Sequence, residues 1–114
     1  MNNNILSRQV RRNGRLGERY TEIQHASGLK VFVYPKKCSS VYAVLQVGLG
    51  SMDSEYLDAD GNTCTMPLGT AHYLEHKMFE SEHGDVMNDF SEMGANVNAY
   101  TSYTETCYTF STCQ

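Results

Sequence analysis

The chain has 114 residues and a mass of 12.8 kDa, which corresponds to one domain at most, or to part of one. Its composition, 40% hydrophobic and 19% charged, excludes wholesale disorder, and no apolar run reaches the roughly 18 residues that a membrane-spanning helix needs. The N-terminus also lacks the hydrophobic stretch of a secretory signal, so the sequence predicts a soluble cytoplasmic protein.

The net charge of −4 is distributed unevenly along the chain. Five of the nine basic residues lie in the first nineteen positions, whereas the stretch from Tyr20 onward carries four Lys and twelve acidic residues. An acidic body repels phosphates, which argues against nucleic-acid binding. We interpret residues 1–18 as a basic N-terminal arm and 19–114 as the folded part. The alternative, a mitochondrial transit peptide, fits poorly with the three Asn at 2–4 and the absence of Ala from this arm.

β-Forming residues mark the first strands. The run at 29–34 (LKVFVY) stops at Pro35, and the run at 41–47 (VYAVLQV) alternates apolar residues and ends at Gly48. With a weaker alternation at 22–25, these runs predict two or three hairpin-connected strands. Residues sharing one face of the second run are Val41, Ala43, Leu45 and Val47.

Residues 50–68 are rich in turn-forming side chains and predict a long loop. Within it, Asp58, Asp60 and Asn62 resemble the start of a calcium-binding loop. The glycine and the terminal Glu that an EF-hand requires are missing, so we discount calcium binding here.

Two helices and a hairpin follow. Apolar residues at helical spacing predict a helix over 70–79 and a second over 85–93, which Gly94 ends. The β-rich segments 96–102 and 105–112 predict an antiparallel hairpin turning at Tyr103 and Thr104. The order βββ–αα–ββ indicates an α+β fold, an antiparallel β-sheet with helices packed on one face.

The four cysteines show no spacing typical of a metal site. Without a secretion signal, they are expected to be reduced, partly buried thiols. They are Cys38, Cys64, Cys107 and Cys113.

The sequence His72-Tyr73-Leu74-Glu75-His76 has the arrangement H-x-x-E-H. On a helix, His72 and His76 lie one turn apart, so both imidazoles project to one side and can bind one Zn²⁺. Glu75 lies beside them, where its carboxylate can act as general base toward a water held by the metal. Two imidazoles and a carboxylate also suit manganese or cobalt, although zinc is preferred.

Chance produces this motif in about one chain of this composition in a hundred. The alternative is a pair of surface histidines on an amphipathic helix with an ordinary salt-bridging Glu. The motif is therefore strong but needs support from the surrounding sequence.

That surrounding sequence resembles the pitrilysin/insulinase family of zinc metallopeptidases, whose inverted motif defines the inverzincins. The segment 69–80 is similar to the zinc helix of the family, and the resemblance extends over about 16–112, nearly the whole chain. Lys77, where many relatives have Met, points to a bacterial branch of paired, cytoplasmic insulinase-like proteins. Further segments that match family motifs are 28–36, 50–53 (GSMD), 90–95 (FSEMGA) and 98–101 (NAYT).

The resemblance implies a zinc-dependent endopeptidase, with His72 and His76 as metal ligands and Glu75 as general base. It also implies that a substrate peptide adds as an extra strand along an edge strand beside the zinc. The residues implied in substrate binding are Asn98, Ala99, Tyr100 and Thr101. From the residues alone, a structural strand is the preferred explanation of this stretch.

A catalytic zinc needs three protein ligands, and the motif supplies two. The resemblance places the third, a Glu, beyond Gln114, so we expect an N-terminal portion of a catalytic domain that is inactive alone. Glu105, Asp85 and His83 are other possible ligands, although none stands at the family position.

The main alternative function is a non-catalytic subunit or interaction module that binds a partner or peptide by strand addition. Partners implied by the resemblance are a peptide substrate and either a paired insulinase-like subunit or a C-terminal domain outside this chain. We also expect self-association, because an incomplete domain exposes apolar surface. We expect that surface around Val86, Phe90 and Phe110.

Overall fold

The computed structural model describes residues 4–81 and 84–113. The chain divides into two units, one up to Cys38 and the other from Ser39 onward. Among the described residues, no helix is long and apolar enough to cross a membrane.

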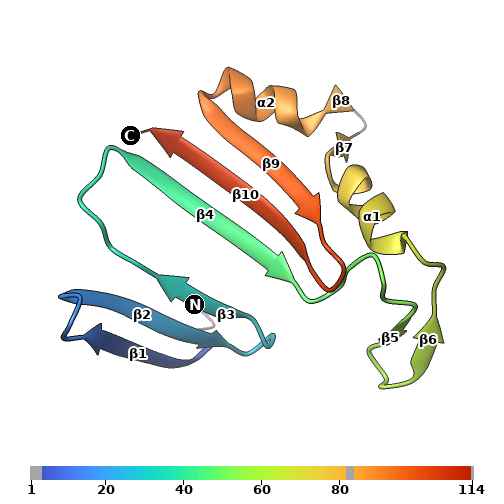
Figure 1. Ribbon diagram of the computed structural model, residues 1–114, viewed down its shortest axis with the longest axis horizontal. Helices are drawn as coiled ribbons and strands as arrows, with labels where there is room; N and C mark the ends of the chain where they lie inside the picture. The colour runs from blue at the N-terminus through green and yellow to red at the C-terminus, as the bar shows by residue number, and fades with distance from the viewer. Residues whose placement is uncertain (1–3, 82–83, 114) are drawn as a thin grey trace. The chain divides into compact units, whose positions relative to one another are not determined.

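The first unit is a three-stranded antiparallel sheet in the order β1-β2-β3 (Figure 1). Two aromatic rings stack where β2 begins and β3 ends. The ring centroids of Tyr20 and Tyr34 lie 4.8 Å apart, and the angle between the ring planes is 25°. Arg11 Nε also donates to Glu22 Oε2 across the β1–β2 pair at 3.2 Å. The strands are β1 (Ile5–Asn13), β2 (Glu18–His25) and β3 (Lys30–Val33).

The basic segment corrects one prediction. Residues 5–13, which we assigned to a basic arm, instead form β1 and pair with β2. The unit therefore continues to Cys38 without a break at residue 18. All nine residues of β1 are exposed, so the strand has no buried face that would require alternating apolar residues. Without that alternation, the arginine-rich sequence gives no strand signal.

The second unit contains an antiparallel sheet in the order β4-β10-β9, so that β9 and β4 are its two edges. Both predicted helices are present, and the predicted hairpin turns at 102–105 as expected. Within this unit, each predicted strand and helix differs from its observed bounds by at most one residue at either end. The elements are β4 (Ser40–Val47), α1 (Thr70–Met78), α2 (Val86–Glu92), β9 (Ala95–Thr101) and β10 (Thr106–Cys113).

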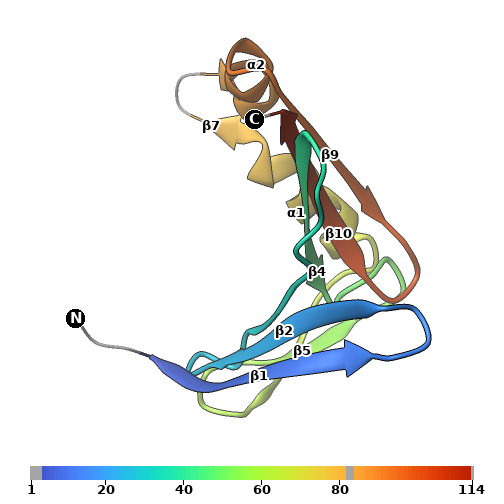
Figure 2. The same cartoon turned by 90° about the vertical axis from the view of Figure 1, so that its left-hand side faces the viewer.

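Aromatic contacts hold both helices on one face of this sheet. Phe79, at the end of α1, lies 6.0 Å from Tyr108, and Phe90 of α2 lies 5.6 Å from Phe110, measured between ring centroids. Because Tyr108 and Phe110 are two residues apart on β10, they share a face. Figure 2 shows the two helices on the same side of β9 and β10. The predicted α+β fold is confirmed.

The segment predicted as a long loop contains a short hairpin, β5 (Glu55–Leu57) and β6 (Thr63–Thr65). Asp58 closes its turn, since its Oδ1 accepts from the backbone N–H groups of Asp60 and Asn62 at 2.9 and 2.8 Å. Hydrogen bonds from Asn62 also lower the pKa of Asp58. The residues that resemble a calcium loop thus form a hydrogen-bonded turn. A second short hairpin joins the helices through β7 (Glu80–Ser81) and β8 (Gly84–Asp85).

The expected exposed apolar surface lies elsewhere than predicted. Val86, Phe90 and Phe110 are all half-buried, because Phe90 and Phe110 pack on each other. The helices contact β9 and β10, and the apolar face of β4 stays open. On that face Val41, Leu45 and Val47 are 43%, 50% and 41% exposed.

Gly50 allows the loop after β4 to dock against the β9–β10 turn. Gly50 is buried, and a Cβ atom there would overlap the backbone of Tyr103 and Thr104. The backbone N–H groups of Ser51 and Met52 donate to the carbonyls of Ser102 and Tyr103 at 2.9 and 3.1 Å. A side chain at position 50 would force these hydrogen bonds apart.

We therefore expect Gly50→Ala to lower the free energy of unfolding by about 1 to 3 kcal/mol, the usual cost of overpacking. Urea denaturation followed by circular dichroism measures the change. Gly48→Ala is the matched control, since a Cβ atom at Gly48 meets nothing within 4 Å. Equal stability of the two variants would contradict the proposed close approach.

Candidate zinc site and peptide edge

Helix α1 begins after Gly69, whose φ of 86° lets the chain turn sharply into the helix. Thr70 Oγ1 donates to the Pro67 carbonyl at 2.6 Å and fixes this start. Ala71 is 2% exposed and anchors the first turn against the unit. The next residues of α1 carry the H-x-x-E-H motif.

The two motif histidines converge as the sequence predicts. Their Nε2 atoms lie 3.1 Å apart, and their rings meet edge to face at 73°. Two nitrogen ligands of one tetrahedral zinc, each about 2.05 Å from the metal, lie roughly 3.3 Å apart. The side chain of His72 is 61% exposed, so a metal can reach the pair from solvent. The geometry of His72 and His76 therefore fits two zinc ligands.

Glu75 is held in place by the neighbouring strand. Its side chain is 13% exposed, and its Oε2 accepts a hydrogen bond from Thr101 Oγ1 of β9 at 2.6 Å. The same oxygen lies 3.9 Å from His72 Nδ1. Burial and the negative charge of Glu75 raise the pKa of Tyr108. The motif carboxylate thus lies beside the histidine pair in a fixed orientation.

The strand expected to receive substrate, β9, is an edge strand, as the resemblance implies. Alternation along β9 divides its four predicted residues between the two faces of the sheet. Thr101 and Ala99 lie on the helix side, because Thr101 reaches Glu75, whereas Asn98 and Tyr100 lie on the other side.

The side chains on that other face have partners of their own. Asn98 Oδ1 accepts from the backbone N–H of Ala99 at 2.9 Å. A hydrogen bond with the buried thiol of Cys107 raises the pKa of Tyr100. Of the cysteines expected to be partly buried, Cys107 is buried and Cys64 half-buried, whereas Cys38 and Cys113 are exposed.

A cavity of about 540 Å³ opens between α1 and β9. Its lining includes Glu75 and His76 from the motif together with Asn98 and Ala99 from the edge strand. The site residues and the strand edge therefore border one hollow, of the size that small-molecule and peptide sites commonly have.

The other ligands considered from the sequence do not join the histidines. Asp85 caps α2, where its Oδ1 accepts from the Met87 N–H at 2.8 Å, and Glu105 accepts a hydrogen bond from Gln46. His83 lies outside the described residues. Within 4–81 and 84–113, no group of three His, Cys, Asp or Glu side chains is arranged to bind a metal.

Sequence reasoning assigned Thr101 to substrate binding and missed its contact with Glu75. These residues are 26 positions apart, and the packing of α1 on the sheet brings them together. Thr106 was also missed. It is 3% exposed, and its Oγ1 donates to the Leu49 carbonyl at 2.8 Å.

Comparison with known proteins gives consistent results. The model of the family "Insulinase (Peptidase family M16)" matches residues 31–114. The "Uncharacterized zinc protease YmfH" of Bacillus subtilis is 47% identical over 88 residues, which cover 75% of this chain and 21% of that protein. A mitochondrial protein of Euglena gracilis, "Ubiquinol-cytochrome-c reductase complex core protein I", is 36% identical over 67 residues, covering 43% of this chain and 14% of that protein.

A solved structure shows the same fold. The crystal structure of a "putative M16-like peptidase" from Alicyclobacillus acidocaldarius has a TM-score of 0.71 and 34% identity, covering 96% of this chain and 23% of that one. The chain thus spans about a fifth of the length of YmfH. The family match, the identity to YmfH and the shared fold together show that the chain belongs to the insulinase family of peptidases, M16.

Proposed function

We propose that this chain is the zinc-binding portion of a metalloendopeptidase that hydrolyses peptide bonds. His72 and His76 would hold the metal, and Glu75 would serve as general base. The observation that carries the proposal is the approach of the two Nε2 atoms to 3.1 Å with Glu75 fixed beside them. The names of relatives, which call them zinc proteases, support zinc as the metal.

The chain's own residues divide the catalytic work. A bound zinc ion would lower the pKa of a water molecule toward about 7. The Glu75 carboxylate would accept the proton of the attacking water and later deliver it to the leaving amine. Thr101 is a positioning residue, because its hydroxyl donates to Glu75 Oε2 and holds that carboxylate in one orientation.

The peptide substrate would lie along β9. An extended peptide can add to a free strand edge through main-chain hydrogen bonds, and alternate side chains then enter pockets on either side. Asn98 and Ala99 border the cavity that Glu75 and His76 also line, which would bring the peptide close to the metal. The Ala99 N–H is held by Asn98 Oδ1, so an incoming peptide would have to displace that amide to use this donor.

By itself the chain would be inactive. Two protein ligands leave the metal weakly held, because a catalytic zinc site uses three. We propose that the third ligand comes from a further segment of the protein or from a paired insulinase-like subunit. The similarity to a core protein of a respiratory complex supports pairing as one arrangement in this family. A bacterial source and a cytoplasmic location remain predictions from the sequence.

A second candidate function rests on the open edges of the sheet. Both β9 and β4 are edge strands, and β4 carries exposed apolar residues. Such edges suit an interaction module, or self-association by strand pairing. The two candidate functions differ in zinc binding. The peptidase proposal requires zinc binding that depends on His72 and His76, whereas the interaction module does not.

We expect zinc titration against a competing chelator to give micromolar affinity for the 114-residue chain. His72→Ala or His76→Ala should weaken binding at least about 10-fold, because each removes one of two nitrogen ligands. His25→Ala is the control, since His25 lies in the first unit, where its Nδ1 contacts Ser27. Equal binding by all variants would contradict the site and favour the interaction module.

We expect the zinc-loaded chain to leave an unstructured fluorogenic peptide intact, because the metal lacks its third ligand. The measurement is fluorescence release with and without zinc. Turnover that Glu75→Gln abolishes would refute the inactivity of the chain and support the assigned base. A loss of zinc affinity in Glu75→Gln would show instead that Glu75 is a ligand.

Thr101→Val removes the hydroxyl that holds Glu75 and keeps the side-chain shape. We expect the free energy of unfolding to fall by about 1 to 2 kcal/mol, because a largely buried carboxylate loses a donor. Urea denaturation provides the value. Thr112→Val is the control, since that hydroxyl reaches only the carbonyl of the next residue, at 3.3 Å. An equal decrease in the free energy of unfolding in both variants would contradict the role of Thr101 in holding Glu75.

A further inference from the structure

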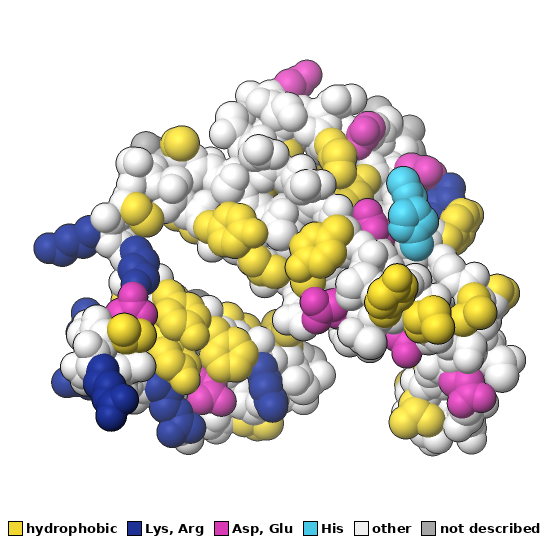
Figure 3. Space-filling model, viewed as in Figure 1, with side chains coloured by type: hydrophobic (Ala, Val, Ile, Leu, Met, Phe, Trp, Pro, Cys, Tyr) yellow, Lys and Arg dark blue, Asp and Glu magenta, His cyan; other side chains and the backbone are white. Residues whose placement is uncertain are grey.

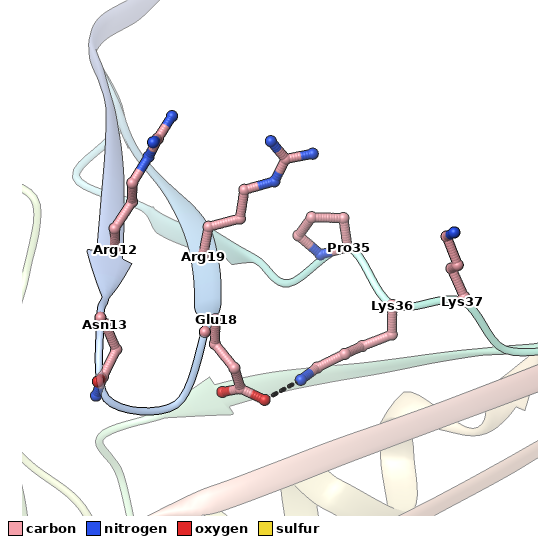
Figure 4. A pocket seen from close by; sticks show the side chains of 9 residues that line it. Arg12, Asn13, Glu18, Arg19, Pro35, Lys36 and Lys37 are labelled. Atoms are coloured by element: carbon pink, nitrogen blue, oxygen red, sulfur yellow. Dashed lines mark hydrogen bonds and ion pairs between the residues drawn. The ribbon is translucent and has the colours of Figure 1, made fainter.

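The first unit contains a basic cleft that the zinc site does not use. It lies at the β1–β2 turn, has a volume of about 560 Å³, and is closed on one side by the segment 35–37 that follows β3 (Figure 4). An ion pair between Lys36 and Glu18 fastens that segment to β2. The cationic residues that line the cleft are Arg12, Arg19, Lys36 and Lys37.

Two of these cations face each other without a counter-ion. Arg12 and Arg19 are direct partners in the β1–β2 register, and both are exposed. Like charges directly opposite on neighbouring strands are destabilising. Among the described residues neither guanidinium forms an ion pair, because Glu18 is engaged by Lys36 and Glu22 by Arg11. An anion bound between the two guanidinium groups would remove the repulsion.

Arginine side chains are the main anion-binding groups of the cleft. Phosphate sites commonly use free backbone N–H groups at a turn or a helix N-terminus. Here the N–H groups of Arg15 and Leu16 in the turn already donate to Asn13 Oδ1, at 3.1 and 3.2 Å. The described part of this unit also has no helix. Two arginine side chains remain, and each can bind a carboxylate through two parallel N–H groups.

Charge is strongly divided between the two units. Residues 1–38 carry eight Lys and Arg against two Glu, whereas residues 39–114 carry one Lys against eleven Asp and Glu. The first unit therefore has a net charge of +6 and the second of −10. Most Lys and Arg side chains visible in Figure 3 lie on the first unit. The chain as a whole has a net charge of −4, which disfavours a long polyanion such as a nucleic acid, whereas a short acidic segment needs only the cleft.

We propose that the basic cleft binds a short peptide segment rich in Asp or Glu, with its carboxylates on Arg12 and Arg19. The aliphatic stems of the arginines and the ring of Pro35 give the cleft the mixed lining that a peptide requires. The binding is independent of zinc and of peptide hydrolysis, so it stands or falls separately from the proposed function.

Fluorescence anisotropy with labelled hexaglutamate at low ionic strength tests the proposal on the 114-residue chain. The double substitution Arg12→Gln and Arg19→Gln should weaken binding roughly 10-fold, the effect expected from two exposed charge pairs. The matched control, Arg8→Gln with Lys30→Gln, removes the same charge from the same unit outside the cleft and should weaken binding less than about 2-fold. Similar losses in both double variants, or no loss in either, would overturn the proposal.

Two further measurements test the kind of ligand and the place where it binds. Competition by tripolyphosphate or single-stranded hexathymidylate that exceeds competition by unlabelled hexaglutamate would overturn the carboxylate assignment in favour of a phosphate ligand. Amide chemical shifts of the unsubstituted chain can be followed by NMR during hexaglutamate addition. This measurement does not depend on whether a substituted chain folds. The shifts should change at 12–19 and 36–37, and changes confined to other segments would also overturn the proposal.

Discussion

The candidate site depends on how helix α1 is attached to the sheet. Phe79 packs on Tyr108 and Phe90 on Phe110, so both helices are held against the same face of β10. This attachment brings Glu75 within hydrogen-bonding distance of Thr101 on the neighbouring strand. The helix alone would present two histidines and a mobile carboxylate. Packing on the sheet converts them into a site with a fixed base beside an edge strand.

The parts of this arrangement that are local in the chain were predictable from the sequence. The spacing of His72 and His76 sets their separation on any helix, and Gly94 and the β-rich runs mark where the later elements begin and end. Strand β1 was missed because a fully exposed strand carries no apolar alternation, and here arginines occupy it. The Thr101–Glu75 contact was also missed, because it joins a helix and a strand 26 positions apart and depends on how α1 packs on the sheet.

Membership in the insulinase family and the geometry of the site support each other, although they rest on different observations. The family match comes from residues spread along 31–114, whereas the fit to zinc comes from two atoms 3.1 Å apart. The chain spans only about a fifth of YmfH, so the complete metal site and its partners belong to the proposal. The basic cleft lies in the other unit and has its own charge and its own proposed ligand.

We propose that this chain presents one metal position between His72 and His76, with Glu75 held by Thr101. A crystal structure of the zinc-loaded chain, with anomalous scattering recorded at the zinc edge, would locate that position. We expect an anomalous peak in contact with Nε2 of both histidines and an intact hydrogen bond from Thr101 to Glu75. A peak located at the cysteines, or a carboxylate of Glu75 turned away from Thr101 while zinc is bound, would contradict it.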